Sequence, residues 1–227
     1  MLLKDLIEKN KITEDLLKNV NNKILHNKVR GISSNSKEIK KGYIFVAIKG
    51  KNFDGAEYIA EAEKLGAFLI IAEETCNKKV FSIKKGTARQ IYTLLLSSFY
   101  IKQPKQIIGV TGTNGKTSTV EFCRQLWALA GWKAASMGTL GTKTETAINK
   151  SVYKNKEENL TTFEPSDLYK KLNFLVEEKI SHLALEASSH GIDQYRLDGV
   201  NFSGAVFTNL SHDHLDYHGN TANYFST

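Results

Sequence analysis

Residues 106–118 read QIIGVTGTNGKTS, and this stretch has the layout of a phosphate-binding loop. Its apolar start predicts a buried strand, which leads through a glycine turn into the start of a helix. Gly112 and Gly115 allow the backbone to bend and to approach a ligand closely. The free N–H groups at the start of the helix, and its dipole, favour an anion there. Lys116 is placed to reach terminal phosphates, and the Thr117 hydroxyl is placed to bind Mg²⁺.

The match to the phosphate-loop pattern is incomplete, because Val110 stands where the strict pattern has its first glycine. The stretch is therefore a variant of the form G-x-x-G-K-T. The alternative is a glycine-rich turn between a strand and a helix that carries an exposed lysine. The agreement of strand, turn and helix start favours the phosphate loop.

Composition is that of an ordinary globular protein, with 41% hydrophobic and 24% charged residues among 227. No run of about 18 apolar residues is present, and residues 1–5 do not resemble a secretory signal. The net charge of +7 comes mostly from scattered lysines without interleaved aromatic residues, which favours solvated lysines over a nucleic-acid surface. We expect a cytoplasmic monomer with reduced Cys76 and Cys123 and with neither nucleic acid nor membrane as a partner.

Strands alternate with helices along the chain, which predicts an α/β protein with parallel sheets. The polar segment at residues 101–105 contains Pro104 and is the expected linker. We therefore predict an N-terminal α/β domain at residues 1–103 and an ATP-binding domain at residues 104–227. The first domain is expected to begin with helical, amphipathic residues at 1–27 and a short strand that runs into a polar turn over 29–37. Strands are expected at 43–48, 67–72 and 80–83, and helices at 58–65 and 87–99. The elements expected after the phosphate loop are helices at 119–131 and 166–179 and strands at 133–140, 182–185 and 204–207.

The helix expected at residues 119–131 has many apolar residues, and we expect all of them on its inner side. They are Val120, Phe122, Cys123, Leu126, Trp127 and Ala130. The polar residues 142–160 that follow predict a hairpin or a loop.

Glu186 follows the expected strand at 182–185 directly, so it lies at the carboxyl edge of a sheet. An acid at the end of a neighbouring strand commonly shares Mg²⁺ with the hydroxyl of a phosphate loop. The alternative is an exposed glutamate without such a role.

A dense polar cluster, SHDHLDYH, follows the expected strand at 204–207. A second Mg²⁺, or a phosphoryl group under transfer, would explain its histidines and aspartates. A capped helix start with Ser211 or Asp213 as the cap is the alternative, and the two can both hold.

Four motifs, in this order and spacing, resemble the Mur ligase family, the ATP-dependent amide-bond synthetases of peptidoglycan assembly. They are GVTGTNGKTS at 109–118, NLTTFEPSDL at 159–168, EASSHGIDQYRL at 186–197 and FTNLSHDHLDYHG at 207–219. The front of the chain is similar more loosely, through GISSNSK at 31–37, GYIFVAIKGKNFDGAEYI at 42–59 and GAFLIIAEE at 66–74.

The resemblance implies roles for particular residues. In the first domain, Ser36 with Lys51, Asn52 and Phe53 would hold the uridine end of a sugar nucleotide. The ATP phosphates would be bound by Gly112, Thr113, Asn114, Gly115, Lys116, Thr117 and Ser118. The muramoyl-dipeptide would be held by Asn159, Thr161, Thr162, Ser188, Gln194 and Arg196. Thr117 and Glu186 would bind one Mg²⁺, and His214 would belong to the shell of a second.

The reaction that the resemblance implies joins a diamino acid, with meso-diaminopimelate favoured, to UDP-MurNAc-L-Ala-D-Glu through an acyl phosphate. ATP and Mg²⁺ are the implied cofactors, and Lys116, Glu186 and His214 the implied catalytic residues. Two departures from the family pattern stand out: Asn35-Ser36-Lys37 replaces Asp-Ser-Arg, and Phe163 replaces a common proline. Lysine lacks the two-pronged guanidinium of arginine, so we expect altered uridine binding.

The family has a metal-binding carbamylated lysine at a position that corresponds to the one immediately after Thr227, and a third domain beyond it. We therefore expect the 227-residue chain by itself not to turn over. Two alternatives stay open: a non-catalytic remnant that binds nucleotide or UDP-sugar, and a ligase of the folylpolyglutamate synthetase kind. The front domain, which suits a uridine nucleotide, speaks against the latter.

Overall fold

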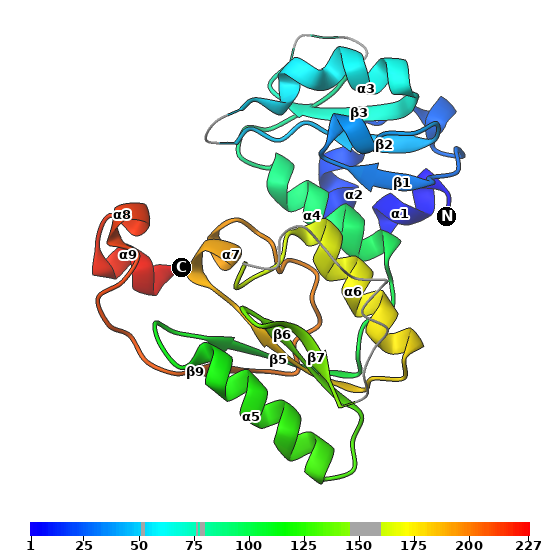
Figure 1. The fold of residues 1–227 in the computed structure, drawn as a ribbon. Coiled ribbons are helices and arrows are strands. Elements are labelled where there is room, and N and C mark those ends of the chain that lie inside the picture. The colour runs from blue at the N-terminus through cyan, green and yellow to red at the C-terminus, as the bar shows by residue number, and fades with distance from the viewer. Residues whose placement is uncertain (51–52, 76, 78–79, 146–159) are drawn as a thin grey trace. The chain divides into compact units, whose positions relative to one another are not determined.

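The computed structural model describes residues 1–50, 53–75, 77, 80–145 and 160–227 (Figure 1). The chain forms two compact units, Met1–Ile101 and Lys102–Thr227. The division falls within the segment expected as a linker, two residues before the predicted end of the first domain. The functions assigned to the two domains remain predictions.

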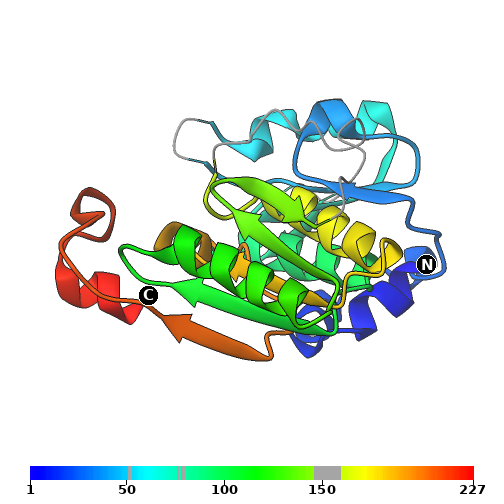
Figure 2. The ribbon, with the colours of Figure 1, turned by 60° about the horizontal axis from the view of Figure 1, so that its bottom comes forward.

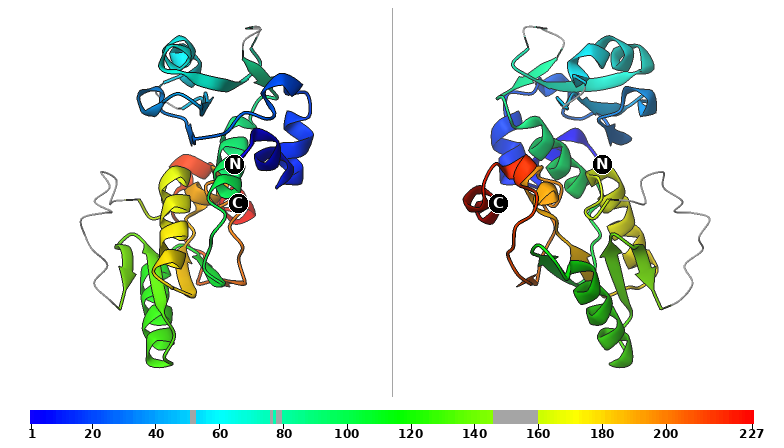
Figure 3. Two further views of the ribbon diagram at one scale, coloured as in Figure 1. Left: turned by 90° about the vertical axis from the view of Figure 1, so that its right-hand side faces the viewer. Right: turned by 60° about the vertical axis from the view of Figure 1, so that its left-hand side comes forward.

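Unit 1 is a four-stranded parallel sheet with helices on both faces. Its strands follow sequence order across the sheet: β1 (Gly31–Ser33), β2 (Tyr43–Val46), β3 (Ala67–Glu73) and β4 (Phe81–Ile83). Figure 3 shows α3 (Ile59–Leu65) on one face of this sheet and, on the other, α1 (Leu3–Glu8), α2 (Lys11–Leu17) and α4 (Ala88–Phe99). Short 3-10 helices occupy Asn22–Ile24, Ser36–Glu38 and Gly55–Tyr58.

The elements of unit 1 form where apolar residues have a regular spacing and end where backbone geometry requires it. Helix α3 ends at Gly66, whose φ of 102° is a left-handed conformation that glycine adopts without strain, as the sequence predicted. Buried Phe45 and Ile70 from neighbouring strands pack with Ala62 of α3 in the core. The predicted strands and helices of this unit are confirmed, with shifts of a few residues at their ends.

Unit 2 is built on a five-stranded sheet in the order β7-β6-β8-β5-β9. The strands are β5 (Gln106–Thr111), β6 (Ala134–Gly138), β7 (Gly141–Thr144), β8 (His182–Glu186) and β9 (Gly204–Phe207). All pairs are parallel except the hairpin of β6 and β7. The helices are α5 (Lys116–Leu129), which lies along one face of the sheet in Figure 2, α6 (Pro165–Glu177), α7 (Ser189–Asp193), α8 (Leu215–His218) and α9 (Thr221–Ser226).

Strands β5 and β8 are neighbours in the sheet, and the connections that leave their carboxyl ends run in opposite directions across it. From β5 the chain passes through α5 to β6, on one side, and from β8 it passes through α7 to β9, on the other. Ligands of open α/β sheets bind at the carboxyl ends of strands where the connections diverge in this way. Val110 of β5 is paired with Glu186 of β8, so the phosphate loop and the predicted metal ligand start from the same point of the sheet.

Helix α5 differs from the sequence prediction in its start and in its buried face. It begins at Lys116, three residues earlier than expected, because the glycine turn leads straight into it. Val120, Cys123 and Trp127 pack against the sheet, but Phe122 and Leu126 are 62% and 64% exposed. The prediction of one inner face was wrong for Phe122 and Leu126, because their helical positions lie away from the stripe of residues 120, 123 and 127. It was also wrong for Ala130, which is exposed at the C-cap, after the last residue of the helix.

Some predictions fall partly outside the described residues. Cys123 is a free thiol whose pKa is raised by burial, whereas Cys76 is outside. Of the residues 142–160 that were expected to form a hairpin or a loop, the first three belong to β7, which pairs with β6 through a turn at residues 139–140, and residues 146–159 are outside. Among the helices that the structure describes, none is long and apolar enough to span a bilayer.

Candidate nucleotide and substrate site

The phosphate loop takes a form that only its glycines permit. Gly112 has a φ of 126° and Gly115 a φ of 85°, both left-handed, and α5 begins with the next residue, Lys116. A Cβ on Gly112 would overlap the Thr208 hydroxyl and lie 2.8 Å from the carbonyl oxygen of Asn209. The turn therefore presents the free N–H groups of the first turn of α5 at the carboxyl edge of the sheet, as an anion site requires.

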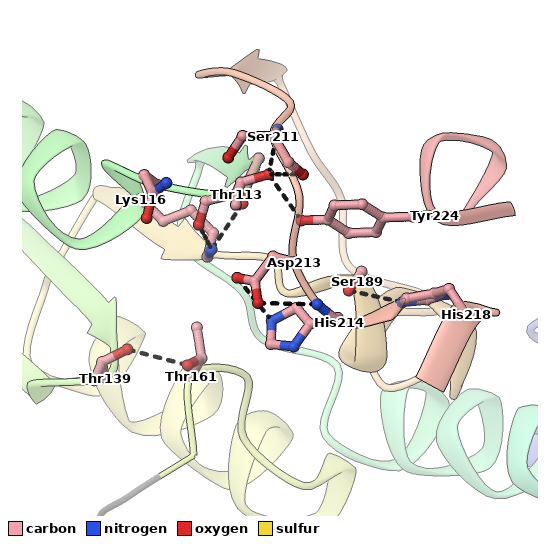
Figure 4. Close-up of polar contacts among 12 residues, drawn as sticks. Thr113, Lys116, Thr139, Thr161, Ser189, Ser211, Asp213, His214, His218 and Tyr224 are labelled. Atoms are coloured by element: carbon pink, nitrogen blue, oxygen red, sulfur yellow. Dashed lines mark hydrogen bonds and ion pairs between the residues drawn. The ribbon is translucent and has the colours of Figure 1, made fainter. Parts of the chain in front are cut away.

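The Thr113 side chain holds the loop in place through hydrogen bonds. Its side chain is buried, and its hydroxyl lies 3.2 Å from the Tyr224 hydroxyl and accepts a 2.9 Å hydrogen bond from the Ser211 N–H (Figure 4). The neighbouring Asn114 is exposed, and its N–H donates to Asn209 Oδ1 at 3.1 Å. Segments from β9 onward therefore hold the loop in its bent form.

Lys116 is half-buried and folded over the loop. Its Nζ donates to the carbonyl oxygens of Gly112 and Thr113 at 2.7 and 2.8 Å (Figure 4). Burial lowers the pKa of Lys116, and the charges of Glu186 and Asp213 raise it in part. The alternative of a loop with an exposed lysine is therefore not what the structure shows, because the ammonium lies at the mouth of the turn within the field of two carboxylates.

Glu186 is 1% exposed, so the alternative of an exposed glutamate is wrong. Its Oε1 accepts a 3.0 Å hydrogen bond from the Thr139 N–H, and the Thr139 hydroxyl donates to its Oε2 at 3.3 Å. A Cβ on Gly138 would overlap the carboxylate, so this glycine leaves the space that Glu186 occupies. A buried carboxylate held by neutral donors is typical of a group that meets a cation.

The donor set fits a magnesium-bound nucleotide better than a metal held by protein alone. Within the part of the chain that the structure describes, no three His, Cys, Asp or Glu side chains are grouped so as to hold a metal ion together. Mg²⁺ usually takes one or two protein oxygens and completes its shell with phosphate oxygens and water. Half-buried Thr117 in the first turn of α5 and the Glu186 carboxylate carry oxygen atoms of the kind that could serve as such ligands. Exposed Ser118 follows in the same turn.

Four of the residues expected to hold the muramoyl-dipeptide, Thr162, Ser188, Gln194 and Arg196, form one hydrogen-bonded network. Buried Thr162 donates to the Glu186 carbonyl oxygen at 3.1 Å and accepts from the Ser188 N–H at 2.8 Å. Arg196 donates to the Thr162 carbonyl oxygen at 2.9 Å and to Gln194 Oε1 at 2.8 Å. Arg196 also forms a 2.9 Å ion pair with Glu164, so its guanidinium is held in place at the site.

His214 lies in a cluster of rings beside this network. Its ring contacts that of His190, with centroids 4.7 Å apart, and its Nε2 lies 3.6 Å from Asp213 Oδ2. Burial lowers the pKa of His190, and the neighbouring His214 and His218 lower it further. The capped-helix alternative holds only in part, because α8 begins after His214, whose φ is 52°, and has no side-chain cap.

The predicted uridine residues lie in unit 1. Ser36 is buried at the start of a short 3-10 helix that Asn35 caps, with the Lys37 N–H donating to Asn35 Oδ1 at 3.1 Å. Phe53 is 60% exposed. Three further predicted residues, Lys51, Asn52 and Asn159, are outside the described residues.

Sequence reasoning missed several residues that build the site. Gly138 and Thr139 surround the Glu186 carboxylate, and Tyr224 and Ser211 hold the phosphate loop. Only Gly138 and Thr139 gave a signal that could have been used, because they lie at the end of the strand expected at 133–140, and a parallel sheet brings such ends to the same edge as Glu186. The contacts of Tyr224 bridge more than a hundred positions along the chain and depend on the tertiary fold.

Two family models match the chain. The Mur ligase middle domain matches residues 110–227, and the model described as the Mur ligase family, catalytic domain, matches residues 28–96. The first match alone covers more than half of the chain.

Curated relatives with the name UDP-N-acetylmuramoyl-L-alanyl-D-glutamate--2,6-diaminopimelate ligase are similar over most of the chain. The protein from Brucella melitensis is 42% identical over 199 residues, 86% of this chain and 39% of its own length. That from Rickettsia rickettsii is 43% identical over 202 residues, 88% of this chain and 41% of its own. The chain thus spans about two fifths of the length of the relatives it matches.

Solved structures show the same fold. A structure of UDP-N-acetylmuramoyl-L-alanyl-D-glutamate--2,6-diaminopimelate ligase matches with a TM-score of 0.77 at 26% identity, over 100% of this chain and 43% of the other. The MurF ligase of Thermotoga maritima, solved in complex with ADP, matches with a TM-score of 0.55 at 23% identity, over 88% of this chain and 42% of the other.

Proposed function

Because this chain belongs to the Mur ligase family, we propose that it supplies the nucleotide-binding part of an ATP-dependent ligase that adds a diamino acid to UDP-MurNAc-L-Ala-D-Glu. The names of its relatives favour 2,6-diaminopimelate as that amino acid. The resemblance to the family implies peptidoglycan precursor synthesis in the cytoplasm as the setting. One observation carries the proposal: the ends of two adjacent strands lead to a half-buried ammonium on a bent glycine loop and to a buried carboxylate, Lys116 and Glu186.

In this proposal the nucleotide binds at the N-terminus of α5. ATP, with Mg²⁺, would supply the phosphoryl group that activates the substrate carboxylate. Lys116 would exchange the loop carbonyls for phosphate oxygens, since an ammonium favours a charged acceptor over a neutral one. Thr117 and Glu186 would hold Mg²⁺, and His214 would lie near a second ion.

The muramoyl-dipeptide would be held by the network around Thr162. Arg196 is held by Thr162, Gln194 and Glu164, and in this proposal its guanidinium would bind a substrate carboxylate or phosphate. Asn159, Thr161 and Ser188 would contribute further polar contacts. In unit 1, Ser36 and Phe53, with Lys51 and Asn52, would bind the uridine.

Calorimetric titration with ADP tests the nucleotide site. We expect the wild-type chain to bind ADP more tightly with Mg²⁺ than without. Lys116→Met should weaken binding by about tenfold or more, because it removes a charge-assisted contact to phosphate. Lys102→Met is the matched control, since Lys102 is an exposed lysine of the same unit that pairs with Glu177, and it should bind ADP as the wild type does. A wild-type chain that fails to bind ADP would refute the proposal.

The substrate class has its own test. The chain should bind UDP-MurNAc-L-Ala-D-Glu more tightly than a folate in the same calorimetric experiment. Tighter binding of the folate would favour the folylpolyglutamate synthetase alternative and overturn the proposed substrate.

A further inference from the structure

We propose that Thr139 is a positioning residue, which fixes the Glu186 carboxylate for a divalent cation and links it to Thr161 in the substrate network. This inference rests on the proposed function, because it concerns the same site. Thr139 lies outside all the sequence motifs that resemble the Mur ligase family.

The end of β6 forms a cradle for the Glu186 side chain. β6 runs parallel to β8, with Met137 paired to Leu185, so that Gly138 and Thr139 lie beside Glu186 at the carboxyl edge. A Cβ at Gly138 would overlap the carboxylate, and the space is open only because this residue is glycine. Glu186 can therefore lie flat across the strand end, where the Thr139 N–H reaches it at 3.0 Å.

Thr139 contacts both oxygens of the carboxylate. The backbone N–H binds Oε1, and the hydroxyl lies 3.3 Å from Oε2. Two donors on two oxygens fix both the position of the carboxylate and the tilt of its plane. Each ionised oxygen still has a free lone pair that can accept a cation. Donors around a metal-binding carboxylate orient it in this way in many sites, and their loss weakens metal binding.

The same hydroxyl reaches the substrate network. Thr139 Oγ1 lies 3.1 Å from Thr161 Oγ1, as Figure 4 shows, while Thr162 donates to the Glu186 backbone carbonyl at 3.1 Å. A threonine hydroxyl has one proton and two lone pairs. The Thr139 hydroxyl lies within donating distance of both Glu186 Oε2 and Thr161 Oγ1, so its single proton can be given to either oxygen, and one side chain joins the carboxylate to the segment that precedes α6.

The test compares the Kd for ADP with and without Mg²⁺ in the full chain. Thr139→Val removes the hydroxyl and keeps the branched shape, and we expect it to reduce the strengthening of ADP binding by Mg²⁺ by about tenfold. The Mg²⁺-free Kd should stay within about twofold of wild type, since Thr139 has no proposed contact with the phosphates. Thr139→Ser restores the hydroxyl and should restore the Mg²⁺ effect, which a purely structural role would not predict. Thr161→Val should give a smaller change, of about two- to threefold, because it removes only the second acceptor of the Thr139 hydroxyl and leaves Thr139 in place.

Each outcome decides a different point. If Thr139→Val keeps the full Mg²⁺ effect while Lys116→Met loses ADP binding, the positioning role is wrong and the proposed function stands. If the wild type binds ADP equally well with and without Mg²⁺, the metal site and the role of Thr139 are both refuted. An unchanged Thr161→Val variant refutes the link to the substrate network alone. Thr139→Ala makes the same comparison should Thr139→Val fail to fold, as judged by circular dichroism.

Discussion

The two sheets of this chain differ in strand order, and the difference decides where a site can form. In unit 1 the strands lie in sequence order, so each crossover moves in the same direction across the sheet. In unit 2 the connections that leave β5 and β8 diverge, and the strand ends between them carry the phosphate loop and Glu186. The strand order of unit 2 thus favours ligand binding at the carboxyl ends of β5 and β8, whereas a site in unit 1 must be built from loops.

The candidate residues of the two units also differ in how firmly they are held. In unit 2, Glu186 and Thr162 are each 1% exposed and share a continuous network. In unit 1, Phe53 is 60% exposed on a loop. We therefore expect substitutions at the unit 2 site to reduce both stability and binding, and substitution of Phe53 to reduce binding alone.

Gly112→Ala should have the largest effect. The variant must place a Cβ against the Thr208 hydroxyl and the Asn209 carbonyl oxygen at a φ of 126°. Left-handed strain and overpacking together should destabilise unit 2 by about 3 kcal/mol or more and abolish ADP binding. The control in unit 1 is Gly86→Ala, because Gly86 has a φ of 80° but nothing within 4 Å of its Cβ position. That variant should lose only about 1 kcal/mol. Thermal unfolding measures both, and equal losses would contradict the crowding of the loop.

Thr162→Val should have the next largest effect. The variant keeps the side-chain shape but removes the hydroxyl that donates to the Glu186 carbonyl oxygen and accepts from the Ser188 N–H. A buried donor without its partner costs about 1–3 kcal/mol, so urea denaturation should show a loss in this range for unit 2. Affinity for UDP-MurNAc-L-Ala-D-Glu should fall as well. Thr221→Val changes a threonine at the start of α9 that is exposed and should alter neither quantity. A stable Thr162→Val variant would show that the network is not a structural unit.

Phe53→Ala, in unit 1, should reduce binding without reducing stability. Because the ring is exposed, its removal should change stability by less than about 0.5 kcal/mol. If Phe53 stacks on or covers the uridine, affinity for UDP should fall by about 1–3 kcal/mol, the usual value of an aromatic contact with a base. Ile101→Ala removes a side chain that is also 60% exposed and serves as the control. Unchanged UDP binding would remove Phe53 from the proposed uridine site.

Local sequence was sufficient to predict the elements and the loop that matter most. The run from Gln106 to Lys116 offers, one after the other, the apolar residues of a buried strand, the glycines of a left-handed turn and the first residue of a helix. The structure has all three elements. Glu186 could be placed because parallel strands bring their carboxyl ends to one edge. In both cases a periodic pattern and one special residue type determine the local geometry.

The misses have a common physical origin, since they depend on partners that are distant in sequence. The prediction for α5 failed because its apolar residues occupy two faces, and only packing against the sheet decides which of them is buried. The role of Tyr224 could not be predicted, because no pattern around this residue indicates the loop hydroxyl that it contacts.

His182 gives the smallest expected effect, at the edge of the same sheet opposite the site. β8 begins at His182 and ends at Glu186, and the His182 ring stacks on that of Trp132 with centroids 4.4 Å apart. Burial, and then the charge of Lys105, lower the pKa of His182 from its ordinary value of 6.5. Below pH 6.5 the unfolded chain therefore binds more protons at this position than the folded chain does, so the free energy of unfolding should fall as the pH falls through this lowered pKa. His182→Gln should make the pH dependence shallower between about pH 7 and 5. Urea denaturation over this pH range measures the slope, and a slope that His182→Gln leaves unaltered would show that the stacked histidine does not contribute to acid sensitivity.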